Sequence, residues 1–137
     1  MLSVNYWAIL VSAIASMVIG SIWYGPLFGK LFMREMGMDK WSKEKQAAMK
    51  KTMGLTYAAQ FIASLVMFYT LAGLMAGFGQ TSVSGGLLVA FIVWAGFVVP
   101  TKLGDALWAG NKTLFWLGIG NMLVTLLAVG VIVGAWR

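Results

Sequence analysis

Residues 52–101 read TMGLTYAAQFIASLVMFYTLAGLMAGFGQTSVSGGLLVAFIVWAGFVVPT and contain no charged side chain. A transmembrane helix needs about 20 consecutive apolar residues, so this stretch is long enough for two of them. The natural break is GQTSVSGG at 79–86, because runs of glycine and hydroxyl residues favour turns. We therefore predict two membrane-spanning helices joined by a short turn.

Two further charge-free stretches, 1–29 and 113–136, flank this central segment. Each is long enough for one more span. Inside a bilayer every backbone N–H must be bonded within its own helix or within a closed barrel, and unbroken apolar runs favour helices. The prediction is an all-α polytopic membrane protein, a single transmembrane domain over 1–137. Its four spans are expected at about 4–24, 54–78, 84–108 and 113–136.

The composition excludes most soluble enzyme classes. The chain is 61% hydrophobic and 10% charged, whereas soluble domains carry about 25% charged residues. It has no cysteine and no histidine, and Glu35, Asp39 and Glu44, three of its four acidic residues, lie in one polar connector. We therefore expect no enzyme activity, no cofactor and no metal site. We assign the net charge of +6 to basic residues facing anionic lipid, so we expect no nucleic-acid partner.

The basic residues are concentrated in two connections. They are Lys30, Arg34, Lys40, Lys43, Lys45, Lys50 and Lys51 between the first two spans, and Lys102 and Lys112 around the third loop. The positive-inside rule places both connections in the cytoplasm and both termini outside, in a bacterial inner membrane. We expect the cytoplasmic connector 27–53 to begin with an interfacial helix at 27–38 and to contain a short helix capped by Ser42.

Small residues recur at helical spacing in three spans. They are Ala8, Ser12, Ser16 and Gly20 in the first, Gly73 and Gly77 in the second, and Gly130 and Gly134 in the fourth. Such stripes let membrane helices approach closely. Each stripe could pack within the bundle or form a seam between copies. Because a four-helix unit cannot bury all three fully, we expect a homo-oligomer.

Polar residues of three spans are expected at one depth. Gln60, Asn121 and the pair Lys102 and Asp105 lie roughly 5 to 12 Å from the cytoplasmic ends of their helices at about 1.5 Å per residue. Lys102 and Asp105 share a helix face and can pair, and Pro100 before them leaves a backbone carbonyl free. The pair either closes a helix end as an interfacial salt bridge or lines a polar cavity open to the cytoplasm.

The string Trp23-Tyr24-Gly25-Pro26-Leu27-Phe28-Gly29-Lys30 follows a small-residue helix opened by Asn5-Tyr6-Trp7, and WAGFVVP occupies 94–100. This pattern resembles a bacterial family of small four-helix membrane proteins that is known only as a domain of unknown function. The most specific positions are Trp23, Tyr24, Pro26, Gly29 and Lys30. The resemblance covers nearly the whole chain and implies a four-span inner-membrane protein, without a substrate, cofactor or catalytic residue.

These observations favour a small, homo-oligomeric transporter or channel-like protein for a small solute or ion, with the polar layer facing a cavity. The alternative is a non-transporting structural or accessory protein that packs with partner helices in the bilayer. A membrane-embedded enzyme is the third hypothesis. A proton-coupled antiporter would be expected to carry a carboxylate nearer the middle of the membrane, and the sequence has none there. The substrate is not indicated by the sequence.

Overall fold

The computed structural model describes residues 4–136, and within them the elements are helices. In chain order these are α1 (Tyr6–Ile22), the π-helix η1 (Trp23–Leu27), α2 (Gly29–Met36), the short η2 (Met38–Lys40), α3 (Lys43–Gly77), α4 (Val83–Val93), the π-helix η3 (Trp94–Val98), α5 (Val99–Ala109) and α6 (Lys112–Ala135). Four helical segments are long and apolar enough to cross a membrane: Tyr6–Leu27, Lys43–Gly77, Val83–Ala109 and Lys112–Ala135. The predicted all-α class is confirmed, and so is the prediction of four helices that could span a membrane.

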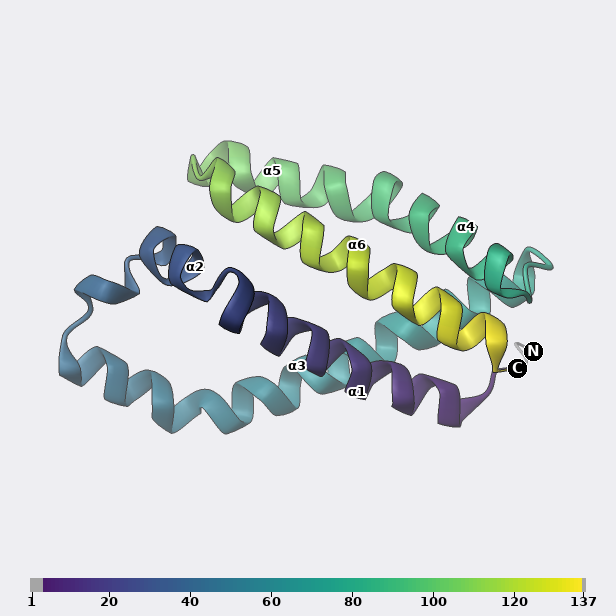
Figure 1. The fold of residues 1–137 in the computed structure, drawn as a ribbon, viewed down its shortest axis with the longest axis horizontal. Helices are drawn as coiled ribbons and strands as arrows, with labels where there is room; N and C mark the ends of the chain where they lie inside the picture. The colour runs from purple at the N-terminus through teal and green to yellow at the C-terminus, as the bar shows by residue number, and fades with distance from the viewer. Residues whose placement is uncertain (1–3, 137) are drawn as a thin grey trace.

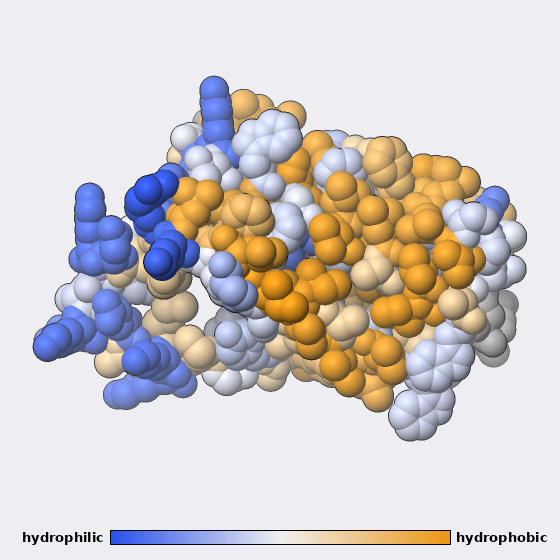
Figure 2. All heavy atoms as spheres, viewed as in Figure 1, coloured by the Kyte–Doolittle hydropathy of each residue, from blue (hydrophilic) through white to orange (hydrophobic). Residues whose placement is uncertain are grey.

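The four long segments form an elongated bundle in which α6 contacts α1, α3, α4 and α5 (Figure 1). The start of α1 and the end of α6 lie at one end, together with the turn between α3 and α4, and we call this the terminal end. The other end holds α2, the start of α3 and the loop between α5 and α6, and we call it the connector end. Hydrophilic residues gather at the connector end, whereas hydrophobic residues cover the middle of the bundle (Figure 2).

The hydrophobic core lies in the half of the bundle nearer the terminal end. All four spans contribute to it. The buried cluster consists of Ile9 and Ala13 from α1, Phe68, Leu71, Ala72 and Met75 from α3, Val89 and Ala90 from α4, and Leu126, Val129 and Val133 from α6. The four spans are therefore tightly packed against one another in this half of the bundle.

Helix α3 is longer than the sequence predicts. Ser42 caps it as expected, since its hydroxyl accepts a hydrogen bond from the Lys45 N–H at 3.2 Å. The predicted short helix is wrong, however, because the helix that begins at Lys43 continues without a break to Gly77. At about 1.5 Å per residue it is roughly 52 Å long, whereas the hydrocarbon core of a bilayer is about 30 Å thick. Its first turns therefore project beyond the membrane, and the connector over 27–53 is largely helical.

The turn between the second and third spans lies within the expected break at 79–86, and α4 begins at Val83, one residue before the expected start of the third span at 84. The hydroxyl of Ser82 accepts a hydrogen bond from the Gly85 N–H at 3.1 Å and so caps α4. Gly85 and Gly86 therefore belong to the first turns of this helix, within the expected span at 84–108. The reversal itself uses Gly79, whose φ of +68° lies in the left-handed region that favours glycine.

Two π-helical turns, which sequence patterning does not predict, interrupt the first and third spans. In η1 the Phe28 N–H donates to the carbonyl of Trp23, five residues earlier. In η3 the Val99 N–H donates in the same way to the carbonyl of Trp94. Pro26 lies inside the first turn and Pro100 follows the second. A proline cannot donate to the preceding turn of an α-helix, which gives a physical reason for the wider turns at these positions.

Candidate functional site

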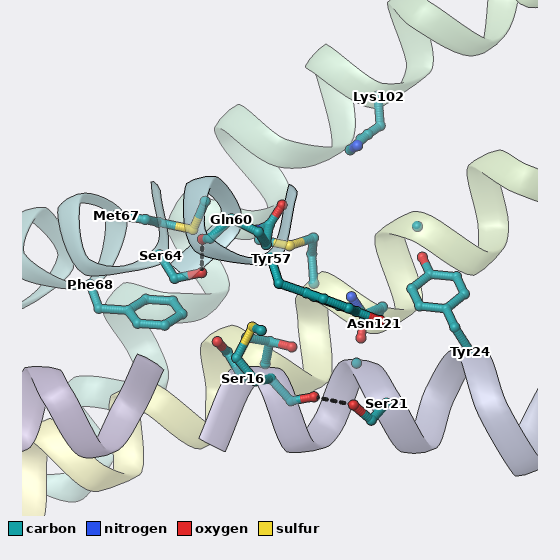
Figure 3. Close-up of a pocket in the computed structure, with 15 residues that line it drawn as sticks. Ser16, Ser21, Tyr24, Tyr57, Gln60, Ser64, Met67, Phe68, Lys102 and Asn121 are labelled. Atoms are coloured by element: carbon teal, nitrogen blue, oxygen red, sulfur yellow. Dashed lines mark hydrogen bonds between the residues drawn. The ribbon is translucent and has the colours of Figure 1, made fainter. Parts of the chain in front are cut away.

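A cavity of about 580 Å³ lies between four helical segments on the connector side of the core (Figure 3). Its lining residues are Ser16, Met17, Gly20 and Ser21 from α1, Tyr24 from η1, Tyr57, Gln60, Ser64, Met67 and Phe68 from α3, Lys102 from α5, and Gly118, Asn121, Met122 and Thr125 from α6. Phe68 also belongs to the hydrophobic core. The core thus forms the floor of the cavity, whose volume lies within the range of small-molecule sites.

Helical rise arranges the polar lining in two layers. Tyr24 and Tyr57 lie nearest the connector end. The first layer holds Ser21, Gln60 and Lys102, and along the first and third spans it lies roughly 10 Å from the ends at Leu27 and Ala109. The second layer, about 5 Å deeper, holds Ser16, Ser64 and Asn121. The cavity therefore offers polar groups at two depths.

The serine hydroxyls of the lining present acceptors to the cavity. Ser16 donates its hydroxyl proton to the carbonyl of Ala13 at 2.7 Å, and Ser64 donates to the carbonyl of Gln60 at 2.9 Å. Ser21 does the same to a carbonyl four residues earlier, at 2.8 Å. A hydroxyl has only one proton to donate, so the lone pairs of these oxygens remain available to accept.

Asn121 contributes an amide group to the deeper layer. Its Oδ1 atom is buried and has no hydrogen-bond partner among the residues that the structure describes. A buried polar atom without a partner costs about 1 to 3 kcal/mol, so such atoms are normally paired with protein or water. The Asn121 side chain lines the cavity, but this oxygen has essentially no accessible surface, so it is not an open acceptor for a solute.

Lys102 is the one charged residue among the described residues that line the cavity. Its side chain extends from α5 toward the space between the helices (Figure 3). Asp105 and Pro100, which the sequence placed in the same layer, are exposed and lie outside the lining. No ion pair joins Lys102 to Asp105 within residues 4–136. The structure thus brings together Gln60, Lys102 and Asn121.

Two tryptophans fix α6 along the cavity. The indole Nε1 of Trp23 donates to the carbonyl of Leu117 at 3.0 Å, and that of Trp94 donates to the carbonyl of Ile119 at 2.7 Å. Each tryptophan is the first residue of a π-helix. A Cβ atom on Gly120 would lie 2.8 Å from the Trp23 ring, so glycine lets that ring rest against α6. Both π-helical turns are therefore tied to the same helix, two residues apart.

The remaining motif positions shape the junction between η1 and α2. Tyr24 lines the cavity, and its ring packs on Phe32 with 4.7 Å between centroids. A Cβ atom on Gly29 would lie 2.8 Å from the backbone oxygen of Tyr24, which explains the glycine at the start of α2. Lys30 is exposed. Together with Pro26 in η1, Tyr24 and Gly29 shape the junction at which the polypeptide leaves the bundle.

The small-residue stripes of α1 and α6 are used inside the bundle. Ala8 and Ser12 are fully buried, and Ser16 and Gly20 line the cavity. Gly130 packs on the backbone of Gly86, and Gly134 on that of Ser82. On α3, Gly73 and Gly77 line a groove of about 390 Å³ whose described lining belongs to that helix alone, together with Tyr69, Thr70, Leu74 and Phe78. Gly73 is itself buried, so on α3 only the exposed Gly77 remains a candidate for a seam between copies.

Sequence patterning missed several cavity residues, among them Ser21, Tyr57, Ser64 and Thr125. A signal was available, because the lining residues repeat at helical spacing on each span. The repeats are Ser16, Gly20 and Tyr24 in the first span, Tyr57, Gln60 and Ser64 in the second, and Gly118, Asn121 and Thr125 in the fourth. Residues at such spacing share one helix face.

Comparison with known proteins identifies the family. The family described as "Protein of unknown function (DUF1761)" matches residues 7–134, and the chain belongs to it. No curated protein and no solved structure shows a significant match. The family confirms the resemblance that the Trp-Tyr-x-Pro-x-x-Gly-Lys motif indicates.

Proposed function

We propose that this member of the DUF1761 family is a membrane transport protein whose cavity takes up a small polar solute or ion. The observation that carries the proposal is the set of polar side chains that line an open cavity between helices long and apolar enough to span a membrane. Polar groups at membrane depth are costly, and in membrane proteins they mark solute and ion paths. Gln60, Lys102 and Asn121, from three different helices, supply such groups at one site.

The basic residues support an orientation in which the cavity opens toward the cytoplasm. The connector end carries the lysine-rich connector and the loop between α5 and α6, and the positive-inside rule favours the cytoplasm for both. The packed core closes the cavity toward the other side. Release on that side would need a second state in which the core opens. The π-helical turns at Trp23 and Trp94 are where the first and third spans could bend.

A structural or accessory role is the second candidate, and the groove on α3 favours it. Gly77 is exposed in this groove, and a Cβ atom there would meet no atom within 4 Å. Small residues in such a place let a neighbouring helix approach closely, either of a second copy or of a partner protein. If the groove is a seam between copies, Gly77→Leu lowers the assembly state measured by native mass spectrometry. An unchanged assembly state would contradict a seam between copies at this groove.

Flux measurements in proteoliposomes separate the two candidates. Purified wild-type protein is expected to carry protons, alkali cations or small anions faster than empty liposomes. Asn121→Leu fills the deeper layer of the cavity with an apolar side chain and should reduce that flux several-fold. Lys112→Gln, which removes a charge outside the cavity, is the control and should leave the flux unchanged. Wild-type flux equal to that of empty liposomes would contradict transport and favour the structural role.

A further inference from the structure

We infer that the cavity binds a small oxyanion, a carboxylate or a phosphate group, and that Lys102 is its charged partner. This inference deepens the proposed function, on which it rests, by naming the class of solute. It follows from the sign of the charge in the lining and from the hydrogen-bond donors around it.

Lys102 gives the cavity a positive charge. It is the one charged residue among the described lining residues, so these offer no carboxylate to a cation. Its side chain extends from α5 toward the space between the helices (Figure 3). Asp105, one turn further along α5, is exposed and lies outside the lining, and within residues 4–136 it forms no ion pair with Lys102. The ammonium group therefore attracts an anion into the cavity and repels a cation.

Neutral donors face the same cavity from two other elements. The hydroxyls of Tyr24 in η1 and Tyr57 in α3, and the amide NH2 of Gln60, can each donate a hydrogen bond to an oxyanion. The wall beside them includes apolar side chains such as Met17, and charge interactions are stronger beside apolar walls than in water. One cation together with several neutral donors is a chemistry that suits carboxylate and phosphate oxygens.

Donors continue into the deeper part of the cavity. The amide NH2 of Asn121 and the hydroxyl of Thr125 belong to the same lining. Ser16 and Ser64 offer lone pairs instead, because their protons are donated to backbone carbonyls. These oxygens carry no formal charge, so they do not offset the repulsion that a cation meets at Lys102. The lining as a whole therefore favours an anion.

Positive charge is also in excess at the connector end, toward which the cavity lies. Residues 30–51 and 102–112 carry nine basic and four acidic side chains, which leaves a net charge of +5. Hydrophilic side chains gather at this end of the bundle (Figure 2). A surface with an excess of one sign raises the local concentration of ions of the other sign. The approach to the cavity therefore favours the same class of solute as its lining.

A matched series of three-carbon molecules tests this inference, because a cavity of about 580 Å³ has room for such a solute with accompanying water. Propionate carries a carboxylate, propylamine an ammonium group and propanol no charge. Apparent Kd values are measured from the rise of the unfolding temperature of the full chain in a neutral detergent, at pH 7 and at constant ionic strength and chloride concentration. Propionate should bind about tenfold more tightly than propylamine or propanol. Equal shifts with propionate and propylamine, or no shift with propionate, overturn the inference.

Variants assign the binding to named side chains. Lys102→Gln should weaken propionate binding about tenfold, whereas Lys102→Arg, which keeps the charge, and Lys112→Gln, outside the cavity, should leave it within about twofold. Tyr57→Phe removes one neutral donor and should weaken propionate binding severalfold. Tyr69→Phe, on the same helix but outside this cavity, is its control and should have no effect. Propionate binding that Lys102→Gln leaves unchanged overturns the role of Lys102.

The headgroups of anionic lipids carry the same oxyanion chemistry, and nanodiscs separate this source from a free solute. Propionate binding is compared in discs of phosphatidylcholine alone and in discs that also contain phosphatidylglycerol. The negative surface potential of an anionic bilayer, about −30 mV, by itself lowers the local concentration of a free anion about threefold. A decrease of that size supports the free solute. A larger decrease, which shows that the headgroup competes for the site, overturns it.

Binding and flux can fail separately. Propionate binding that depends on Lys102, together with no anion flux in proteoliposomes, supports the oxyanion site and contradicts transport. Flux of protons or alkali cations without propionate binding supports transport and overturns the oxyanion site.

Discussion

Replacing Gly130 by alanine tests the close contact between α4 and α6. A Cβ atom on Gly130 would lie 2.5 Å from the backbone oxygen of Gly86 and 2.8 Å from its carbonyl carbon, whereas ordinary contacts begin at 3.4 Å. Backbone atoms cannot rotate aside as a side chain can. The two helices would therefore have to separate locally by nearly 1 Å, the difference between 2.5 and 3.4 Å. Overpacking of this kind costs about 1 to 3 kcal/mol.

Gly104→Ala is the matched control, because a Cβ atom on that helical glycine would meet nothing within 4 Å. Both substitutions gain the same helix propensity, up to about 1 kcal/mol, so the difference between them isolates the steric cost. The free energy of unfolding is measured by far-UV circular dichroism as a denaturing detergent replaces a mild one. Gly130→Ala should be less stable than Gly104→Ala by about 1 to 3 kcal/mol. Equal stability of the two variants would refute the contact between α4 and α6.

Two further predictions concern orientation and the tryptophan hydrogen bonds. In a chain without cysteine, Thr81→Cys should react with an impermeant maleimide in intact cells and Lys43→Cys only after lysis; the reverse pattern contradicts the proposed orientation. Trp23→Phe and Trp94→Phe should each lower the free energy of unfolding by about 1 kcal/mol, because each removes an indole hydrogen bond to α6. Trp116, which is 67% exposed, is the control position, and a loss of equal size for Trp116→Phe would contradict that cause.

The candidate site was only partly predictable, for reasons that particular residues show. Gln60 and Asn121 were predictable from the sequence because isolated amide side chains stand out within apolar spans. Ser64 was not, because serine is common in membrane helices and commonly bonds its own backbone, as it does here with Gln60. Asp105 was grouped with Lys102 because residues three apart share a helix face. Such a face is wide enough for one member to line a cavity while the other stays exposed.

The sequence by itself determined the four spans and the small-residue stripes. Spans are predictable because a helix in a bilayer bonds its own backbone, so a charge-free run of about 20 residues is sufficient evidence for each. Which helix faces pack against one another was decided only by the tertiary structure. Each π-helical turn holds an extra residue and so rotates the side chains beyond it by about 100° relative to a regular helix. The cavity depends on those rotations and on the packing of α6 against Trp23 and Trp94, and such long-range contacts leave no local pattern in the chain.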